Sequence, residues 1–151
     1  MIDEIRNLVK NTQKRVDWNE YFMSLAYLIS SRSPSEKIKV GAVIIKENRI
    51  VTCGYNGYPS GAPHTSIHRD GHEINTIHAE QNAISDAAKR GVSLEGSTLY
   101  VTHYPCINCT KYIISCGIKQ IIYDQDYRND PIVAELLRIT NIPARVYERE
   151  R

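Results

Sequence analysis

The amino-acid sequence predicts an α/β protein in which helices pack on a mixed β-sheet. Stretches with apolar residues at helical spacing alternate along the chain with short runs of β-branched residues. Such alternation is typical of an α/β layer sandwich. Glycine, proline and capping residues stand where these stretches begin and end. Because no repeat or linker is visible, we expect one domain over residues 1–151, with 1–16 as a helical N-terminal extension.

Two helices are expected first. Residues 1–16 form a short amphipathic pattern with four apolar residues on one side, namely Ile2, Ile5, Leu8 and Val9. A second helix should begin near Asp17, because Asp17 and Glu20 have the spacing of a capping box. It should end before Pro34, since proline disfavours helical geometry in the residue that precedes it.

A β-hairpin and a long loop should follow. Two β-rich runs, Val40–Ile45 and Arg49–Cys53, flank the polar segment "KEN". Residues 54–76 are rich in glycine and proline and are therefore expected to form a loop. Loops of this length are usually functional or mobile.

The rest of the chain is expected to alternate between helix and strand. Gly91 and Gly117 are placed to end two of the helices, and Pro131 suits the first turn of a third. The expected helices are His78–Lys89, Pro105–Cys116 and Pro131–Thr140, and the expected strands are 97–103, 119–124 and 144–148.

Composition narrows the class of protein. The chain is 42% hydrophobic and 24% charged with a net charge of +2, so it has no footprint for binding a polyanion. No apolar run is long enough to span a membrane, and the first residues lack the apolar core of a secretory signal. We therefore expect a cytoplasmic protein without nucleic-acid or membrane partners. Its four cysteines indicate thiols or metal ligands rather than disulfides.

Two pairs of side chains at predicted helix starts carry the chemistry. His78 and Glu80 are two residues apart, and Cys106 and Cys109 are three apart. These pairs can meet if both helices point their N-termini at one metal ion. One histidine and two cysteines suit Zn²⁺ and leave a fourth position for water, whose pKa zinc lowers. Glu80 would not bind zinc but would move the proton of that water.

Other interpretations of these motifs remain open. Cys106 and Cys109 could form a redox dithiol, although their flanks do not follow the thioredoxin pattern. They could also form half of a structural zinc site whose further ligand comes from Cys53, Cys116 or His103. The combination of H-A-E with P-C-x-x-C favours a catalytic centre, because it is the signature of zinc deaminases.

The motifs "VGAVII", "GYNGYPSG", "IHAEQNAI" and "PCINC" resemble the deoxycytidylate (dCMP) deaminases of the cytidine deaminase superfamily. The resemblance covers roughly Trp18 to Tyr147. It implies a three-layer α/β/α sandwich around a five-stranded mixed sheet. It also implies one zinc-dependent deaminase domain that hydrolyses dCMP to dUMP and ammonia and so supplies dUMP for dTTP synthesis. The zinc ligands would be His78, Cys106 and Cys109, with Glu80 as proton shuttle.

The resemblance also suggests residues that contact the substrate. Asn56 would contact the sugar, although Asn-Gly is also an ordinary turn dipeptide. Arg32 and Arg128 are candidates for the phosphate, because guanidinium binds phosphate in bidentate fashion. Tyr127 would form an aromatic wall, and Ala79 of the H-A-E motif would line the base.

Regulation is a further implication of the resemblance. Such deaminases are commonly homohexamers, activated by dCTP with Mg²⁺ and inhibited by dTTP. The effector would bind at the "GYNG" stretch, which comprises Gly54, Tyr55, Asn56 and Gly57. Glycine lets backbone N–H groups approach phosphate closely. The alternative is a hairpin exit that binds no effector.

A second, structural zinc is conceivable but not favoured. It would use the loop residues His64, His68 and His72, with Cys53 as a further ligand. Solvent-exposed loop histidines are the default interpretation.

Three rival functions remain. A tRNA adenosine deaminase shares both motifs but needs a basic footprint, and the near-neutral charge and the balanced tail "YERER" argue against it. A free-cytidine deaminase would not need the Tyr127–Arg128 pair. A zinc-stabilised binding protein without catalysis would leave Glu80 unexplained.

Overall fold

The computed structural model describes residues 1–128 and 130–148. The last residues of the charged tail, 149–151, lie outside the described part of the chain. The helices are α1 (Ile2–Asn11), α2 (Trp18–Ser30), α3 (Ala79–Arg90), α4 (Ile107–Ser115) and α5 (Ile132–Ile139). The strands are β1 (Gly41–Lys46), β2 (Arg49–Tyr55), β3 (His68–Arg69), β4 (His72–Glu73), β5 (Thr98–His103), β6 (Gln120–Gln125) and β7 (Ala144–Val146).

The main sheet has five strands in the order β2-β1-β5-β6-β7. Strand β1 is antiparallel to both β2 and β5, whereas β5–β6 and β6–β7 are parallel pairs. Parallel neighbours need a crossover connection, which α4 and α5 provide. The predicted five-stranded mixed sheet is therefore confirmed.

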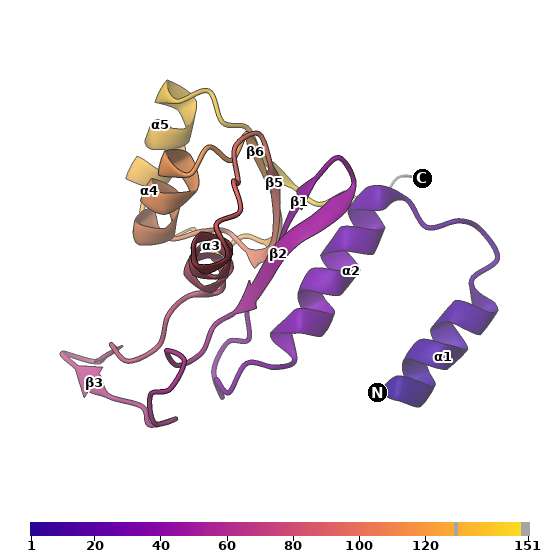
Figure 1. Cartoon of the computed structure of the whole chain (residues 1–151), viewed down its shortest axis with the longest axis horizontal. Coiled ribbons are helices and arrows are strands. Elements are labelled where there is room, and N and C mark those ends of the chain that lie inside the picture. The colour runs from indigo at the N-terminus through magenta and orange to yellow at the C-terminus, as the bar shows by residue number, and fades with distance from the viewer. Residues whose placement is uncertain (129, 149–151) are drawn as a thin grey trace.

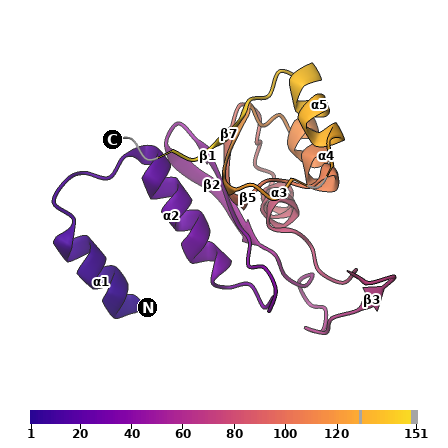
Figure 2. The ribbon, with the colours of Figure 1, turned by 180° about the vertical axis from the view of Figure 1, so that it is seen from behind.

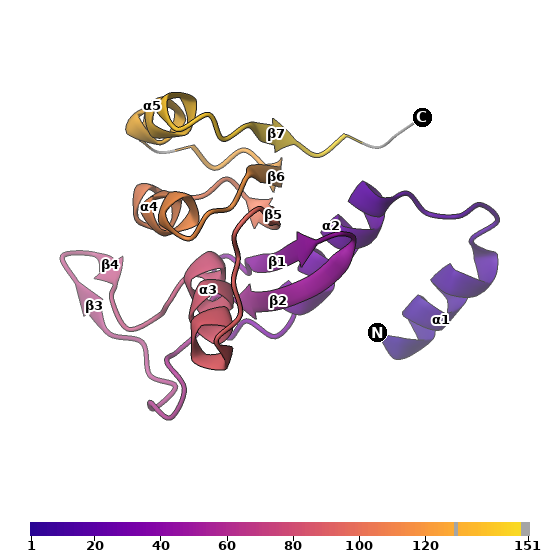
Figure 3. The ribbon, with the colours of Figure 1, turned by 45° about the horizontal axis from the view of Figure 1, so that its top comes forward.

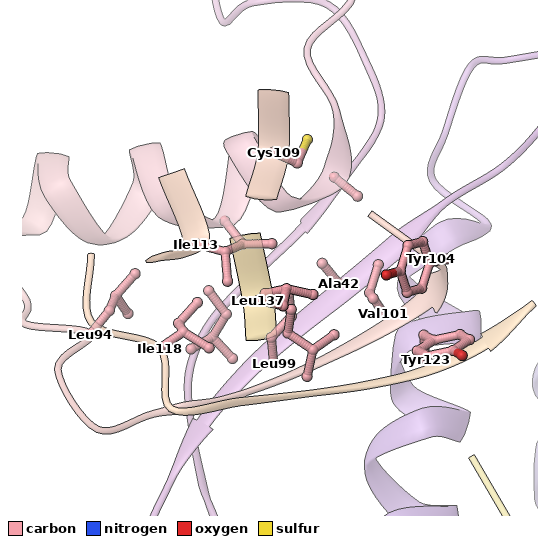
Figure 4. Packing of buried hydrophobic residues seen from close by; sticks show 14 of the residues in the cluster. Ala42, Leu94, Leu99, Val101, Tyr104, Cys109, Ile113, Ile118, Tyr123 and Leu137 are labelled. Atoms are coloured by element: carbon pink, nitrogen blue, oxygen red, sulfur yellow. The ribbon is translucent and has the colours of Figure 1, made fainter. Parts of the chain in front are cut away.

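Helices cover both faces of this sheet, as the predicted three-layer sandwich requires. Figure 1 shows α2 on one side and α3, α4 and α5 on the other, and Figure 2 shows the same layers from behind. On the α2 side, Phe22 and Ala26 pack with Val43 and Tyr100. The opposite side holds the larger core, in which Leu99, Val101, Ile113 and Leu137 lie close together (Figure 4).

The central strands β1 and β5 have almost continuously apolar sequences because helices cover both of their faces. In β1 the five residues from Gly41 to Ile45 are all buried, and β5 shows the same pattern from Thr98 to Thr102. A strand with helices on both faces buries both sets of alternating side chains. The sequence "GAVIIK" is therefore a sandwiched strand rather than an amphipathic one.

The N-terminal extension is shorter than predicted. Helix α1 ends at Asn11 rather than at residue 16, and Thr12 has extended backbone geometry. The Thr12 hydroxyl donates a hydrogen bond to the Leu8 carbonyl oxygen (2.8 Å), which closes the last turn. No residue of α1 is buried. Figure 3 shows α1 apart from the layers, joined to α2 by an extended segment.

The long loop is not wholly irregular, contrary to prediction. Strands β3 and β4 form a small hairpin away from the sandwich. Between them, Asp70 and Gly71 have φ values of 51° and 79°. An Asp-Gly pair with positive φ at both residues is the typical two-residue hairpin turn, so this dipeptide was a signal that the loop interpretation missed.

Within the described part of the chain, no helix is both long and apolar enough to cross a membrane.

Candidate metal centre and active site

Two helix starts converge at the candidate site. His78 precedes α3 and Cys106 precedes α4, and both have extended backbone geometry at the N-cap position. The backbone N–H of His78 donates to Oε1 of Gln81 (3.1 Å), and the Thr110 hydroxyl donates to the Cys106 carbonyl oxygen (2.8 Å). Each helix start is therefore stabilised by a hydrogen bond within its own first turn. Both helices begin near the positions that the sequence predicted, His78 and Pro105.

The three predicted zinc ligands lie together. Nδ1 of His78 is 3.4 Å from Sγ of Cys106 and 3.4 Å from Sγ of Cys109. All three donor atoms lie within 4.8 Å of one another. Around tetrahedral zinc with ordinary bond lengths, a nitrogen and a sulfur ligand stand about 3.5 Å apart. One nitrogen and two sulfurs at these separations fit Zn²⁺, with a fourth position left for a small ligand.

The electrostatics of the pair of cysteines favour a thiolate. The hydrogen bond from the Cys109 thiol, helped by His78, lowers the pKa of Cys106 to about 4 against the effect of burial. The same hydrogen bond, together with burial, raises the pKa of Cys109. The hydrogen bond to Cys106 raises the pKa of His78. Cys106 is the N-cap residue of α4 and Cys109 lies in its first turn, and the helix dipole stabilises negative charge at this end of the helix.

Glu80 lies beside these ligands without joining them. Its side chain is 4% exposed and lines the same pocket as His78 and Cys106. Burial raises the pKa of this carboxyl, while the charge of His78 opposes the shift. A carboxyl group with a raised pKa can accept and return a proton near neutral pH.

The pocket at this centre is small and half enclosed. We call it the inner pocket. Its volume is about 190 Å³. The predicted substrate residues Asn56, Ala79 and Tyr127 line it. The full lining is Ile38, Val40, Asn56, His78, Ala79, Glu80, His103, Tyr104, Cys106 and Tyr127. Three residues that sequence reasoning proposed for the substrate thus border the catalytic group.

A larger hollow of about 680 Å³ adjoins the inner pocket, and we call it the outer hollow. Asn56, His78, Tyr127 and Ile38 line both. One wall of the outer hollow is the segment 34–38, and the other comes from the loop that carries β3 and β4. Because these four residues line both spaces, one ligand can extend from the inner pocket into the outer hollow.

Lys37 lines the outer hollow and was missed by sequence reasoning. Its ammonium forms no ion pair with any residue that the structure describes. The segment is held in place by Asn56, whose Oδ1 accepts from the Val40 N–H (2.8 Å) and whose Nδ2 donates to the Ile38 carbonyl oxygen (2.9 Å). No local pattern signals this contact, because it joins residues 16 and 18 positions apart.

The Asn56-Gly57 dipeptide is not a tight turn. The Gly57 N–H donates to the Ile77 carbonyl oxygen (3.1 Å), and the Asn56 N–H donates to the Val40 carbonyl oxygen (3.2 Å). The turn interpretation is therefore wrong. These two amides are used within the chain, so an effector at "GYNG" would have to rely on other groups.

Gly54 has a packing role. It is buried, and a Cβ atom at this position would stand 2.4 Å from the Ala79 carbonyl oxygen and 2.6 Å from the Ala83 nitrogen. Strand β2 thus approaches the first turn of α3 as closely as a backbone without side chain allows. Tyr55 is half-buried, and its carbonyl oxygen accepts from Nδ2 of Asn82 (2.9 Å).

The two predicted phosphate ligands, Arg32 and Arg128, differ in their surroundings. Arg32 is exposed and lines neither the inner pocket nor the outer hollow. The Arg128 guanidinium is already engaged, with its Nε 3.1 Å from Oδ1 of Asp126 and its centre 4.8 Å from the Tyr104 ring. It also donates a hydrogen bond to the Tyr123 hydroxyl.

The remaining candidates for metal binding lie apart from the centre. Cys53 is exposed, and Cys116 is half-buried with its thiol 3.4 Å from the Ile113 carbonyl oxygen. His64 stacks on Tyr58, and His68 faces Glu73 at 3.9 Å. Within residues 1–128 and 130–148, His78, Cys106 and Cys109 form the group with metal-binding geometry.

An α/β/α sandwich with a one-histidine, two-cysteine metal centre and a buried glutamate defines the class of zinc-dependent deaminases. The model of the cytidine and deoxycytidylate deaminase zinc-binding region matches residues 16–125. The chain belongs to this family.

Relatives support the assignment. The chain is 43% identical to ComE operon protein 2 of Bacillus subtilis over 127 residues, covering 82% of this chain and 67% of that protein. It is 33% identical to the deoxycytidylate deaminase of Schizosaccharomyces pombe over 93% of this chain, but spans only 47% of that protein's length. The dCMP deaminase of cyanophage S-TIM5, solved in complex with dCMP and dUMP, superposes with a TM-score of 0.79. That match has 34% identity and covers 89% of this chain and 100% of that one.

Proposed function

We propose that this protein hydrolyses dCMP to dUMP and ammonia with the help of one zinc ion. The observation that carries the proposal is the buried carboxyl of Glu80 beside three donors spaced for tetrahedral zinc. The bound nucleotides of the cyanophage relative support the choice of dCMP. In this role the enzyme would supply dUMP for dTTP synthesis.

His78, Cys106 and Cys109 would hold the zinc. When bound, the ion would supply Lewis acidity and lower the pKa of water at the site. Glu80 takes a proton from the attacking water and delivers it to the leaving amino group. Its burial excludes bulk water, so the same proton can be returned.

The cytosine ring would lie in the inner pocket, with Ala79 beneath it and Tyr127 as a wall. The Asn56 amide, which donates one N–H to Ile38, keeps a second N–H for the sugar. The phosphate would reach into the outer hollow, where Lys37 offers a cation. Arg32 and Arg128 remain proposed phosphate ligands, and Arg128 would have to release Asp126 to serve.

The test is ammonia release from purified protein with dCMP, deoxycytidine, dCTP and a tRNA anticodon stem. We expect dCMP to be used best. Preference for deoxycytidine would indicate a free-nucleoside deaminase, and turnover of the stem would indicate a tRNA adenosine deaminase. Inactivity of the zinc-loaded protein toward all four would favour a zinc-stabilised binding protein.

We also propose regulation by end products, with a homohexamer that dCTP activates in the presence of Mg²⁺ and dTTP inhibits. The effector would contact the "GYNG" stretch, where Tyr55 is half-buried and next to Asn56 of the inner pocket. By linkage, dCMP would then tighten the binding of dCTP. Turnover at low dCMP should rise several-fold with dCTP and fall again with dTTP. Hyperbolic kinetics indifferent to both nucleotides would contradict regulation but not deamination.

A further inference from the structure

His103 is a titratable side chain of the inner pocket to which the proposed mechanism gives no role. It is the last residue of β5 and lines the inner pocket, but it does not line the outer hollow. It lies outside the group with metal-binding geometry. A half-buried imidazole at this position can contact the ring of a bound nucleotide.

Hydrogen bonds around Thr102 decide which ring nitrogen of His103 carries the proton. The Gly41 N–H donates to the Thr102 hydroxyl oxygen (3.1 Å), and this oxygen lies 2.9 Å from Nδ1 of His103. Thr102 is fully buried. If Nδ1 carried a hydrogen, the Thr102 hydroxyl hydrogen would have no acceptor among the residues that the structure describes. Leaving a buried O–H without a partner costs about 1–3 kcal/mol.

The favoured arrangement is therefore a hydroxyl that donates to an unprotonated Nδ1. In a neutral imidazole the hydrogen then resides on Nε2. Burial lowers the pKa of His103, although the charge of Asp124 opposes the shift, which favours the neutral ring. Tyr127 contacts the imidazole edge to face, with centroids 6.2 Å apart and planes at 86°.

We propose that His103 presents a neutral Nε2–H donor to the inner pocket and hydrogen-bonds the carbonyl oxygen of the pyrimidine base. This assignment rests on the proposed function. The Nε2–H of His103 would donate to the C2 carbonyl oxygen of the pyrimidine. A base with an N–H donor at that position would not be accepted, so the contact selects and orients the base. Thr102 is a positioning residue, because it acts only through the tautomer of His103.

The tautomer is tested first, by ¹⁵N–¹H correlation spectra of the imidazoles in the full chain. The His103 signal is assigned from its loss in His103→Gln. We expect the Nε2–H pattern in the wild type and in Thr102→Ser, which keeps the hydroxyl. Thr102→Val lacks the hydroxyl and should shift the ring toward Nδ1–H. An Nδ1–H tautomer in the wild type would overturn the proposal whether or not the protein deaminates dCMP.

The contact with the base is tested by kinetics. His103→Gln keeps an N–H donor at similar reach and should retain kcat/KM within a few-fold, whereas His103→Phe should lose about tenfold, the size of one hydrogen bond. The loss should be equal for dCMP and deoxycytidine, since both carry the same base. A loss confined to dCMP would place the contact at the phosphate. An unchanged kcat/KM in His103→Phe would show that His103 makes no contact with the base. Either result overturns the proposal. Melting curves of both variants report whether the fold survives.

Discussion

Nδ1 of His78 and Sγ of Cys106 lie 3.4 Å apart at the meeting point of the N-terminal ends of α3 and α4. The pKa of Cys106 is lowered to about 4, so this meeting point holds a thiolate whose negative charge a cation would compensate. A zinc ion would do so, because it binds thiolates and a neutral imidazole together. Binding energy at such a site is also folding energy.

Cys109→Ala and Cys106→Ala should each lose zinc and lower the melting temperature. Free zinc at 100 times its Kd stabilises the folded state by about 2.7 kcal/mol. A chelator should remove this stabilisation from the wild type. Zinc content and thermal unfolding are the measurements. Cys53→Ala is the matched control, because this exposed thiol lies apart from the centre and its loss should leave zinc in place. Full zinc in the Cys106→Ala, Cys109→Ala double variant would refute the ligand assignment.

Glu80→Gln should keep the zinc and the fold but lose turnover. Glutamine fills the same space yet cannot transfer a proton, and general acid–base catalysis is worth about two to four decades. Because burial raises the pKa of Glu80, replacing this carboxyl by a neutral amide should not destabilise the protein strongly. Steady-state kinetics with dCMP and zinc analysis check both statements. Turnover near that of the wild type would mean that another group moves the proton.

Lys37→Ala should weaken the use of dCMP and spare deoxycytidine. A charge-assisted hydrogen bond contributes about 1.5–3 kcal/mol, so kcat/KM for dCMP should fall about tenfold or more. Lys39→Ala is the control, since Lys39 is also exposed but lines neither the inner pocket nor the outer hollow. Equal losses for both substrates, or for both lysines, would speak against a phosphate contact in the outer hollow.

Gly54→Ala should destabilise the fold by about 1–3 kcal/mol, the usual cost of overpacking. Its new Cβ would stand 2.4 Å from the Ala79 carbonyl oxygen, which is backbone and cannot turn away. Gly57→Ala should cost much less, because its nearest neighbour is the Tyr55 ring at 3.3 Å. Urea unfolding of the two variants gives the comparison. Equal stabilities would contradict this prediction and show that α3 can shift to make room for the new Cβ atom.

Much of the site was readable from short stretches of sequence. The H-A-E and P-C-x-x-C motifs each sit at a helix start whose capping and glycine stop are also local, so spacing together with the deaminase signature predicted that the four groups share one site. The hairpin turn at Asp70-Gly71 is equally local, although the surrounding glycines and prolines favour a loop for the whole segment. Local signals suffice where a few neighbouring residues set the backbone conformation.

Tertiary structure decided which side chains face the site. Arg128 resembles a phosphate ligand in sequence, but Tyr104, Tyr123 and Asp126 engage its guanidinium. Lys37 carries no motif, yet two hydrogen bonds from Asn56 hold the segment that brings it to the outer hollow. The physical reason is that packing and hydrogen bonds between residues distant in sequence determine the direction of a side chain. Residue type and spacing reveal what a group can do, and the fold determines whether it reaches the ligand.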